Sequence, residues 1–118
     1  MPKTVMIVDD EPDIRETVKA VLESKGYRIV AASSGDECLE MLKTTTPDLI
    51  LMDIMMPGTP VRKVVRKIKD IKIAYLSVVR TSEAEREELI SNNIVDFIQK
   101  PFDINELATR VDRLLETK

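Results

Sequence analysis

The sequence predicts an α/β fold in which a parallel β-sheet carries helices on both faces. Strand-sized apolar runs alternate with segments of helical period, which gives five β-α units. The run Leu49–Met52 is apolar throughout, as in a central strand of a parallel sheet that is buried on both sides. Right-handed crossovers connect such strands, and ligands bind beyond their carboxyl ends.

The first unit runs from a strand at Val5–Val8 to a helix that ends near Lys25. Pro12 at an early helical position and acidic residues in the first turn mark the start of this helix, and Gly26 supplies its end. The apolar positions of the helix follow the 3.6-residue period: Ile14, Val18, Val21 and Leu22.

The second unit has a strand at Arg28–Ala32 and a helix that opens at Ser33-Ser34-Gly35. The third has a strand at Leu49–Asp53, a loop at Met55–Pro60 and a helix with an apolar face and a largely opposite basic face. The apolar face holds Val61, Val64, Val65 and Ile68, and the basic face holds Arg62, Lys63, Arg66, Lys67 and Lys69.

The fourth unit consists of a strand at Ile73–Val79 and a helix over residues 83–91 that begins at Thr81-Ser82-Glu83. The fifth has a short strand at Val95–Gln99, followed by Lys100-Pro101-Phe102-Asp103 and a final amphipathic helix. The apolar positions of that helix are Ile104, Leu107, Val111, Leu114 and Leu115. We expect residues 1–118 to form one domain, because this length suffices for a substantial core.

Three carboxylates stand where two of the predicted strands end. Asp9 and Asp10 follow the first strand, and Asp53 closes the third. At an effective dielectric constant near 20, two carboxylates about 5 Å apart repel by about 3 kcal/mol, so a cation must relieve them. Oxygen-rich acidic sites suit Mg²⁺. A single strand-end Asp is more often a helix or turn cap, but three of them on two strands favour a functional site.

Composition excludes several other classes of protein. A charged fraction of 33% and a net charge of −3 fit neither a membrane protein nor a nucleic-acid binder. The absence of histidine removes the commonest general base, and the single cysteine, Cys38, is expected to serve packing. With no signal peptide pattern, the expected location is the cytoplasm.

Four motifs in this order resemble the receiver domain of two-component response regulators, the CheY-like group. They are Val8-Asp9-Asp10-Glu11, Asp53 to Gly58, Leu76-Ser77 and Lys100-Pro101-Phe102. The resemblance spans essentially the whole chain and implies a flavodoxin-like (βα)5 fold with strand order 2-1-3-4-5. It also implies a cis peptide bond between Lys100 and Pro101.

The resemblance further implies a phosphoryl-transfer site centred on Asp53. Asp53 would accept the phosphoryl group, and Mg²⁺, or Mn²⁺ in its place, would bind to Asp10 and Asp53. Met55 would add its backbone carbonyl to the metal, and Asp9 would act through a water molecule. Phosphoryl transfer needs in-line positioning and neutralisation of the equatorial oxygens, which suits these residue types.

Three further positions carry over from the family, and two of them, Ser77 and Phe97, belong to the expected switch. Lys100 would neutralise one phosphoryl oxygen, and Ser77 would donate a hydrogen bond to another. As Ser77 moves inward, Phe97 could rotate into the vacated space and change the surface formed by the fourth helix, fifth strand and fifth helix. Each of these residues also has a purely structural interpretation. Lys100 could be a surface lysine, Ser77 a serine bonded to nearby backbone, and Phe97 an ordinary core phenylalanine.

The implied partners are a sensor histidine kinase or a histidine phosphotransfer protein, and an output domain or protein on the switch surface. A phosphorylation-dependent homodimer is a further partner in this scheme. No direct contact with nucleic acid or membrane is expected, because the basic third helix lacks interleaved aromatic residues. The sequence does not distinguish a stand-alone receiver from part of a longer regulator, nor does it identify the kinase or the regulated process.

Other functions are weaker candidates. An aspartyl phosphatase or phosphotransferase needs a proton donor two residues after its nucleophile, and Met55 cannot transfer protons. A flavin-binding protein would need a Ser/Thr/Gly phosphate loop after the first strand. A receiver that has lost its phosphorylation is disfavoured because all five functional positions are present. The chain is therefore expected to catalyse only its own phosphorylation and dephosphorylation.

Overall fold

The structure, a computed structural model, describes residues 2–77 and 93–116 of the chain. Strands and helices alternate within these ranges, as the sequence predicts. The strands are β1 (Thr4–Val8), β2 (Arg28–Ala32), β3 (Leu49–Asp53), β4 (Lys72–Ser77) and β5 (Ile94–Gln99). The helices are α1 (Pro12–Ser24), α2 (Gly35–Met41), α3 (Val61–Arg66) and α5 (Ile104–Glu116).

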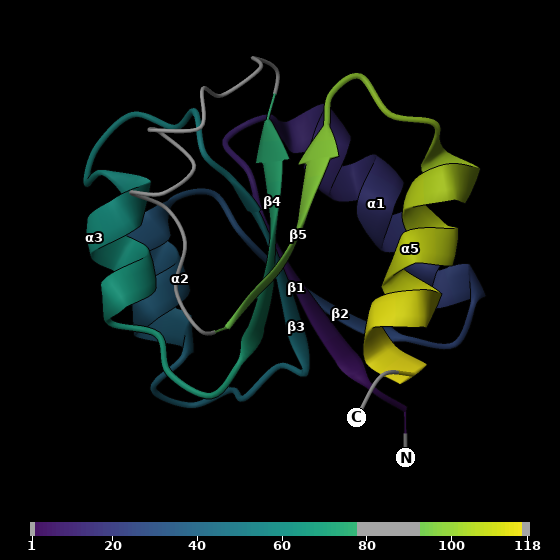
Figure 1. Ribbon diagram of the computed structural model, residues 1–118, viewed down its shortest axis with the longest axis horizontal. Helices are drawn as coiled ribbons and strands as arrows, with labels where there is room; N and C mark the ends of the chain where they lie inside the picture. Colours follow the sequence, from purple (N-terminus) through teal and green to yellow (C-terminus); the bar gives the residue numbers. More distant parts are fainter. Residues whose placement is uncertain (1, 78–92, 117–118) are drawn as a thin grey trace.

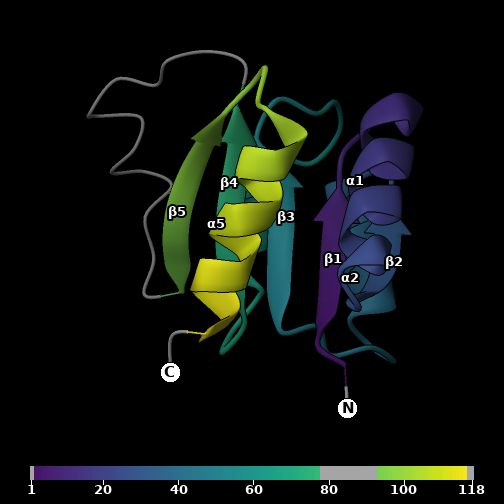
Figure 2. The ribbon, with the colours of Figure 1, turned by 90° about the vertical axis from the view of Figure 1, so that its right-hand side faces the viewer.

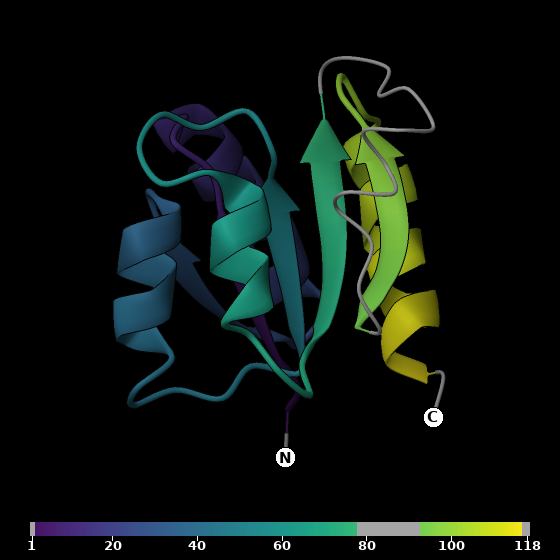
Figure 3. The same ribbon diagram turned by 60° about the vertical axis from the view of Figure 1, so that its left-hand side comes forward.

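The strands form one parallel sheet in the order β2-β1-β3-β4-β5, which confirms the predicted order. Helices α1 and α5 lie on one face of this sheet (Figures 1 and 2), and α2 and α3 lie on the other (Figure 3). All strands point the same way, so their carboxyl ends share one edge of the sheet (Figure 1). The end of α5 lies at the opposite edge, near the start of β1.

Alternate residues of the central strands enter two separate apolar cores. In β1, Val5 and Ile7 pack into the core beneath α1 and α5, whereas Met6 and Val8 pack into the core beneath α2 and α3. The same alternation separates Leu49 and Leu51 from Ile50 and Met52 in β3. Because successive side chains of a strand point to opposite faces, a fully apolar strand is the sequence requirement for a sheet covered on both sides.

Local signals account for several helix ends. Pro12 is the first residue of α1, and Gly26 follows the helix with a φ of 96°, a conformation that glycine adopts without strain. The hydroxyl of Ser34 accepts a hydrogen bond from the N–H of Glu37 and caps α2. Helix α3 ends at Arg66, before Ile68, because the N–H of Ile68 bonds to the carbonyl of Val65 in a tighter turn.

Some predicted features lie outside the described residues. These are the helix expected over residues 83–91 and the last two residues of the fourth strand, Val78 and Val79. Of the surface expected to switch, the described part consists of β5 and α5. Among the described residues, no helix is long and apolar enough to cross a membrane. Cys38 is fully buried, in line with its expected packing role.

Candidate functional site

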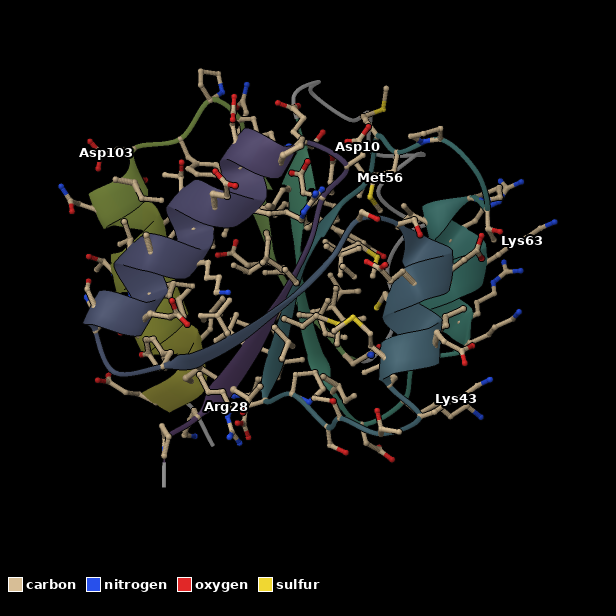
Figure 4. The ribbon with its side chains drawn as sticks, turned by 180° about the vertical axis from the view of Figure 1, so that it is seen from behind. Asp10, Arg28, Lys43, Met56, Lys63 and Asp103 are labelled. Atoms are coloured by element: carbon tan, nitrogen blue, oxygen red, sulfur yellow. The ribbon has the colours of Figure 1, made fainter. Side chains whose placement is uncertain are left out.

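Four charged or polar side chains are buried where the carboxyl ends of the strands meet. Asp9 follows β1, Asp53 and Ser77 are the last residues of β3 and β4, and Lys100 follows β5. Their exposed fractions are 0%, 2%, 7% and 6% in that order. Asp10 lies at the same edge but is exposed (Figure 4). The predicted site residues from four strands therefore come together.

Lys100 occupies the centre of this group. Its Nζ lies 2.6 Å from Oδ2 of Asp9 and 3.3 Å from Oδ2 of Asp53. The Lys100–Pro101 peptide bond is cis, as predicted. The N–H of Lys100 also donates to the carbonyl of Ser77 at 2.6 Å, so the backbone at the end of β5 stays tied to β4. One ammonium group is thus the counter-charge of two buried carboxylates.

Each carboxylate also accepts a hydrogen bond from the loop that follows it. Oδ1 of Asp9 accepts from the N–H of Glu11, and Oδ1 of Asp53 accepts from the N–H of Met55, both at 2.9 Å. These bonds span only two residues, in the manner of the Asx turns that Asp forms readily. They fix the orientation of both side chains with one oxygen of each turned toward Lys100.

The pKa values of both central groups, Asp53 and Lys100, are raised. The pKa of Asp53 is raised, first by loss of solvation and further by the charge of Asp9, against the lowering effects of the Met55 N–H and Lys100. For Lys100, burial alone would lower the pKa, but the two carboxylates outweigh it and the pKa is raised. Lys100 therefore stays charged at neutral pH.

The carboxylates fit a hard divalent cation. Asp9, Asp10 and Asp53 each offer an oxygen atom, and these atoms all lie within 4.8 Å of one another. Mg²⁺ prefers a small number of carboxylates together with water and phosphate oxygens. Within the described part of the chain, the exposed Asp10 carboxylate has no hydrogen-bond or ion-pair partner. This leaves its oxygens available to a ligand.

Phe97 lies in β5, three residues before Lys100. Its ring is half-buried and packs against Tyr75, with the ring centroids 5.2 Å apart and the planes inclined by 50°. Phe97 and Tyr75 are paired across β5 and β4, two residues before Gln99 and Ser77. Phe97 is therefore connected to the site through these two strands.

Two contacts near the site were not predicted from the sequence. Nη1 of Arg15, in the first turns of α1, donates to the backbone carbonyl of Asp9 at 2.7 Å. The hydroxyl of Thr59 donates to Asp36 at 2.9 Å and ties the loop after β3 to the start of α2. Periodicity could not reveal either contact, because both residues occupy ordinary polar positions and the partners belong to other elements.

The comparisons with known proteins agree with this geometry. Residues 5–112 match the family model described as the response regulator receiver domain. The response regulator MprA of Mycolicibacterium vanbaalenii is 32% identical over 98% of this chain and 51% of its own length. The phosphate regulon transcriptional regulatory protein PhoB of Pseudomonas aeruginosa is 34% identical over 96% of this chain and 52% of its own. The chain thus spans about half the length of these curated relatives.

Among solved structures, the response regulator TrrA of Thermotoga maritima, in complex with Mg(2+)-BeF, is 35% identical. It superposes with a TM-score of 0.78 and covers 95% of this chain and 98% of its own. The fold and the paired acid and lysine groups at the strand ends define a signalling module. The chain belongs to the response regulator receiver domain family of two-component systems.

Proposed function

We propose that this chain accepts a phosphoryl group on Asp53 from a phosphohistidine of a cytoplasmic partner, either a sensor histidine kinase or a histidine phosphotransfer protein. The observation that carries the proposal is the position of Asp53. Its carboxylate is buried at the sheet edge, 3.3 Å from the Lys100 ammonium and within the group of carboxylate oxygens that includes Asp10. The other buried carboxylate of the group, that of Asp9, lies closer to the same ammonium, at 2.6 Å, and is therefore neutralised more directly.

In the proposed reaction, the phosphorus–nitrogen bond of the donor breaks as a carboxylate oxygen of Asp53 forms a new bond to phosphorus. The Met55 N–H holds Asp53 in one orientation, which favours in-line attack. Lys100 would neutralise one equatorial oxygen, because its ammonium already lies between Asp9 and Asp53. The hydroxyl of Ser77, at the end of β4, would donate to another.

The metal site would use Asp10, Asp53 and the backbone carbonyl of Met55, with Asp9 acting through water. Bound Mg²⁺, or Mn²⁺ in its place, supplies positive charge that offsets the charge on the phosphoryl oxygens. Lys100 lies closer to Oδ2 of Asp9, at 2.6 Å, than to Oδ2 of Asp53, at 3.3 Å, which supports an indirect role for Asp9. Asp10 has no such partner among the described residues.

The output of the reaction would be a change in surface. Ser77 would move toward the phosphoryl group, and Phe97 would repack in the space beside β4 and β5. The affected surface would include α5 and β5 together with the segment at 83–91, and it would bind an output domain, an output protein or a second copy of the chain. The relatives named as transcriptional regulators, which are about twice as long, support an attached output domain.

A small phosphodonor and Mg²⁺ test this proposal directly. Intact-mass spectrometry should find one added phosphoryl group on the wild type, and peptide mapping should assign it to Asp53. Asp53→Asn should lose the adduct, whereas Asp48→Asn, at an exposed position just before the start of the same strand, should keep it. Removal of Mg²⁺ with a chelator should abolish labelling. An unmodified wild type, or an adduct that survives in Asp53→Asn, would contradict the proposal.

A further inference from the structure

The peptide group that joins Asp9 to Asp10 is held by a side chain that belongs to none of the expected site residues. Nη1 of Arg15 donates to the carbonyl of this peptide at 2.7 Å. Arg15 is half-buried, and its own N–H donates to the carbonyl of Glu11 at 3.2 Å in the first turn of α1. The helix thus fixes the backbone from which the arginine reaches back to the strand end.

Asp9 and Asp10 differ sharply in how they are held. Every polar group of Asp9 has a partner: its N–H donates to Ala32 at 3.1 Å, and its carboxylate accepts from Glu11 and Lys100. The side chain of Asp10 is exposed and has no partner within the described residues. Its direction therefore depends on the backbone, and a rotation of the Asp9–Asp10 peptide would turn its carboxylate away from Asp53.

We propose that Arg15 is a positioning residue for the divalent-cation site, which fixes the Asp9–Asp10 peptide and thereby aims the Asp10 carboxylate. The inference rests on the proposed function, because it assigns Arg15 to the metal site of the same reaction. Groups that orient metal ligands contribute to affinity although they do not touch the ion, and their loss commonly weakens binding 10–100-fold. Arg15 has the geometry of such a group.

The charge of Arg15 makes the test decisive. Loss of the positive charge and loss of the hydrogen bond to Asp9 are expected to change the Mg²⁺ affinity in opposite directions. A guanidinium beside three carboxylates repels an incoming cation, so its removal would by electrostatics alone strengthen Mg²⁺ binding. If Arg15 instead holds the ligand in place, its removal weakens Mg²⁺ binding. The sign of the change in affinity therefore separates the two roles.

The experiment measures Mg²⁺ affinity by calorimetry for the wild type, Arg15→Met and Arg15→Lys. Arg15→Met keeps much of the apolar stem but no donor, and we expect about tenfold weaker binding. Arg15→Lys keeps the charge and a donor and should recover most of the affinity. The matched control is Lys19→Met, which removes one positive charge from the exposed side of the same helix, and it should stay within about twofold of the wild type.

A second measurement needs no metal. In Arg15→Met, the NMR signals of the Asp9 carbonyl carbon and of the Asp10 amide nitrogen should move away from their wild-type positions, because the peptide group that they share has lost its hydrogen bond. The Lys19→Met variant should show no change at this amide. If Arg15→Met does not fold, Arg15→Gln serves in its place, since its side chain is two atoms shorter than that of arginine.

Equal or tighter Mg²⁺ binding by Arg15→Met would overturn the inference, as would unchanged NMR signals of the Asp9–Asp10 peptide group. Failure of the proposed function has a different signature. A wild type that neither binds Mg²⁺ nor takes a phosphoryl group on Asp53 would refute the metal site itself, and the assignment of Arg15 with it. A wild type that does both, beside an Arg15→Met variant that matches it, would refute the Arg15 assignment alone.

Discussion

The two edges of the sheet differ in whether their charged groups share a partner. At the carboxyl edge, Asp9 and Asp53 share one buried ammonium group, that of Lys100. At the other edge, three polar groups in the last turns of α5 have partners that they do not share with one another. Lys3 donates to the carbonyl of Leu115 at 3.0 Å, Lys72 donates to that of Leu114 at 2.7 Å, and Asp112 pairs with Lys25 at 2.6 Å and accepts from Tyr27.

The ionisation of one carboxyl group at each edge shows the consequence. The pKa of Asp53 is raised, mainly by burial, so the fold disfavours its charged form. The pKa of Asp112 is lowered, mainly by its hydrogen bond with Lys25 and then by Tyr27, so the fold favours its charged form. The first edge thus holds a charge arrangement that a cation can improve, as expected of a functional site, while the second edge contributes to stability.

The largest expected effect comes from removing the shared cation. Lys100→Met leaves two buried carboxylates without a counter-charge, and we expect a loss of about 3 kcal/mol in the free energy of unfolding at neutral pH. Urea denaturation without Mg²⁺ measures it. Lys63→Met, on the exposed face of α3 (Figure 4), is the control and should change stability by less than about 0.5 kcal/mol. Equal effects of the two variants would refute the shared-cation description.

The next effect has the opposite sign. Asp53→Asn removes one crowded charge, and we expect the metal-free protein to gain about 1 kcal/mol at neutral pH. Because the pKa of Asp53 is raised in the folded state, its ionisation costs stability as pH rises from the ordinary carboxyl range through the raised value. The gain should therefore shrink as the pH falls through that window. A lower melting temperature for Asp53→Asn at neutral pH, without metal, would contradict the expected repulsion between the buried carboxylates.

A smaller loss is expected at the opposite edge. Lys3→Met or Lys72→Met each removes a charged donor from the carbonyl end of α5, and we expect thermal unfolding to report a loss of about 0.5–1 kcal/mol. Phosphorylation of Asp53 by a small donor should not change. Lys43→Met breaks only the exposed pair with Glu40 and should have no measurable effect. Loss of labelling in Lys3→Met would show that the two edges are coupled.

The smallest effect is a difference in titration rather than in stability. In a carboxyl-carbon NMR titration, Asp53 should titrate above the ordinary carboxyl range and Asp112 below it. With its lowered folded pKa, Asp112 adds stability above the ordinary range, and this contribution disappears as the pH falls through the folded value. Coincident titration of the two groups would remove the distinction between the edges.

Much of the fold and of the site could be predicted because the relevant signals are local. The apolar runs and the helical period set the order of β1 to α5, and Pro12 and Gly26 mark the bounds of α1. The expected site residues Asp9, Asp10, Asp53, Ser77 and Lys100 lie at one edge because they follow strands that run in parallel. Their chemical roles stay predictions.

The sequence by itself determined which residues reach the carboxyl edge, since local pattern places each of them at or directly after the end of a strand in a parallel sheet. Only the tertiary structure decided how they share partners: Lys100 lies closer to Asp9 than to Asp53, and Arg15 holds the carbonyl of Asp9. The physical reason is that a strand end specifies a position to within a few ångströms, whereas hydrogen bonds depend on side-chain rotamers and loop conformations. Those are set by packing between elements as far apart in the chain as Asp9 and Lys100.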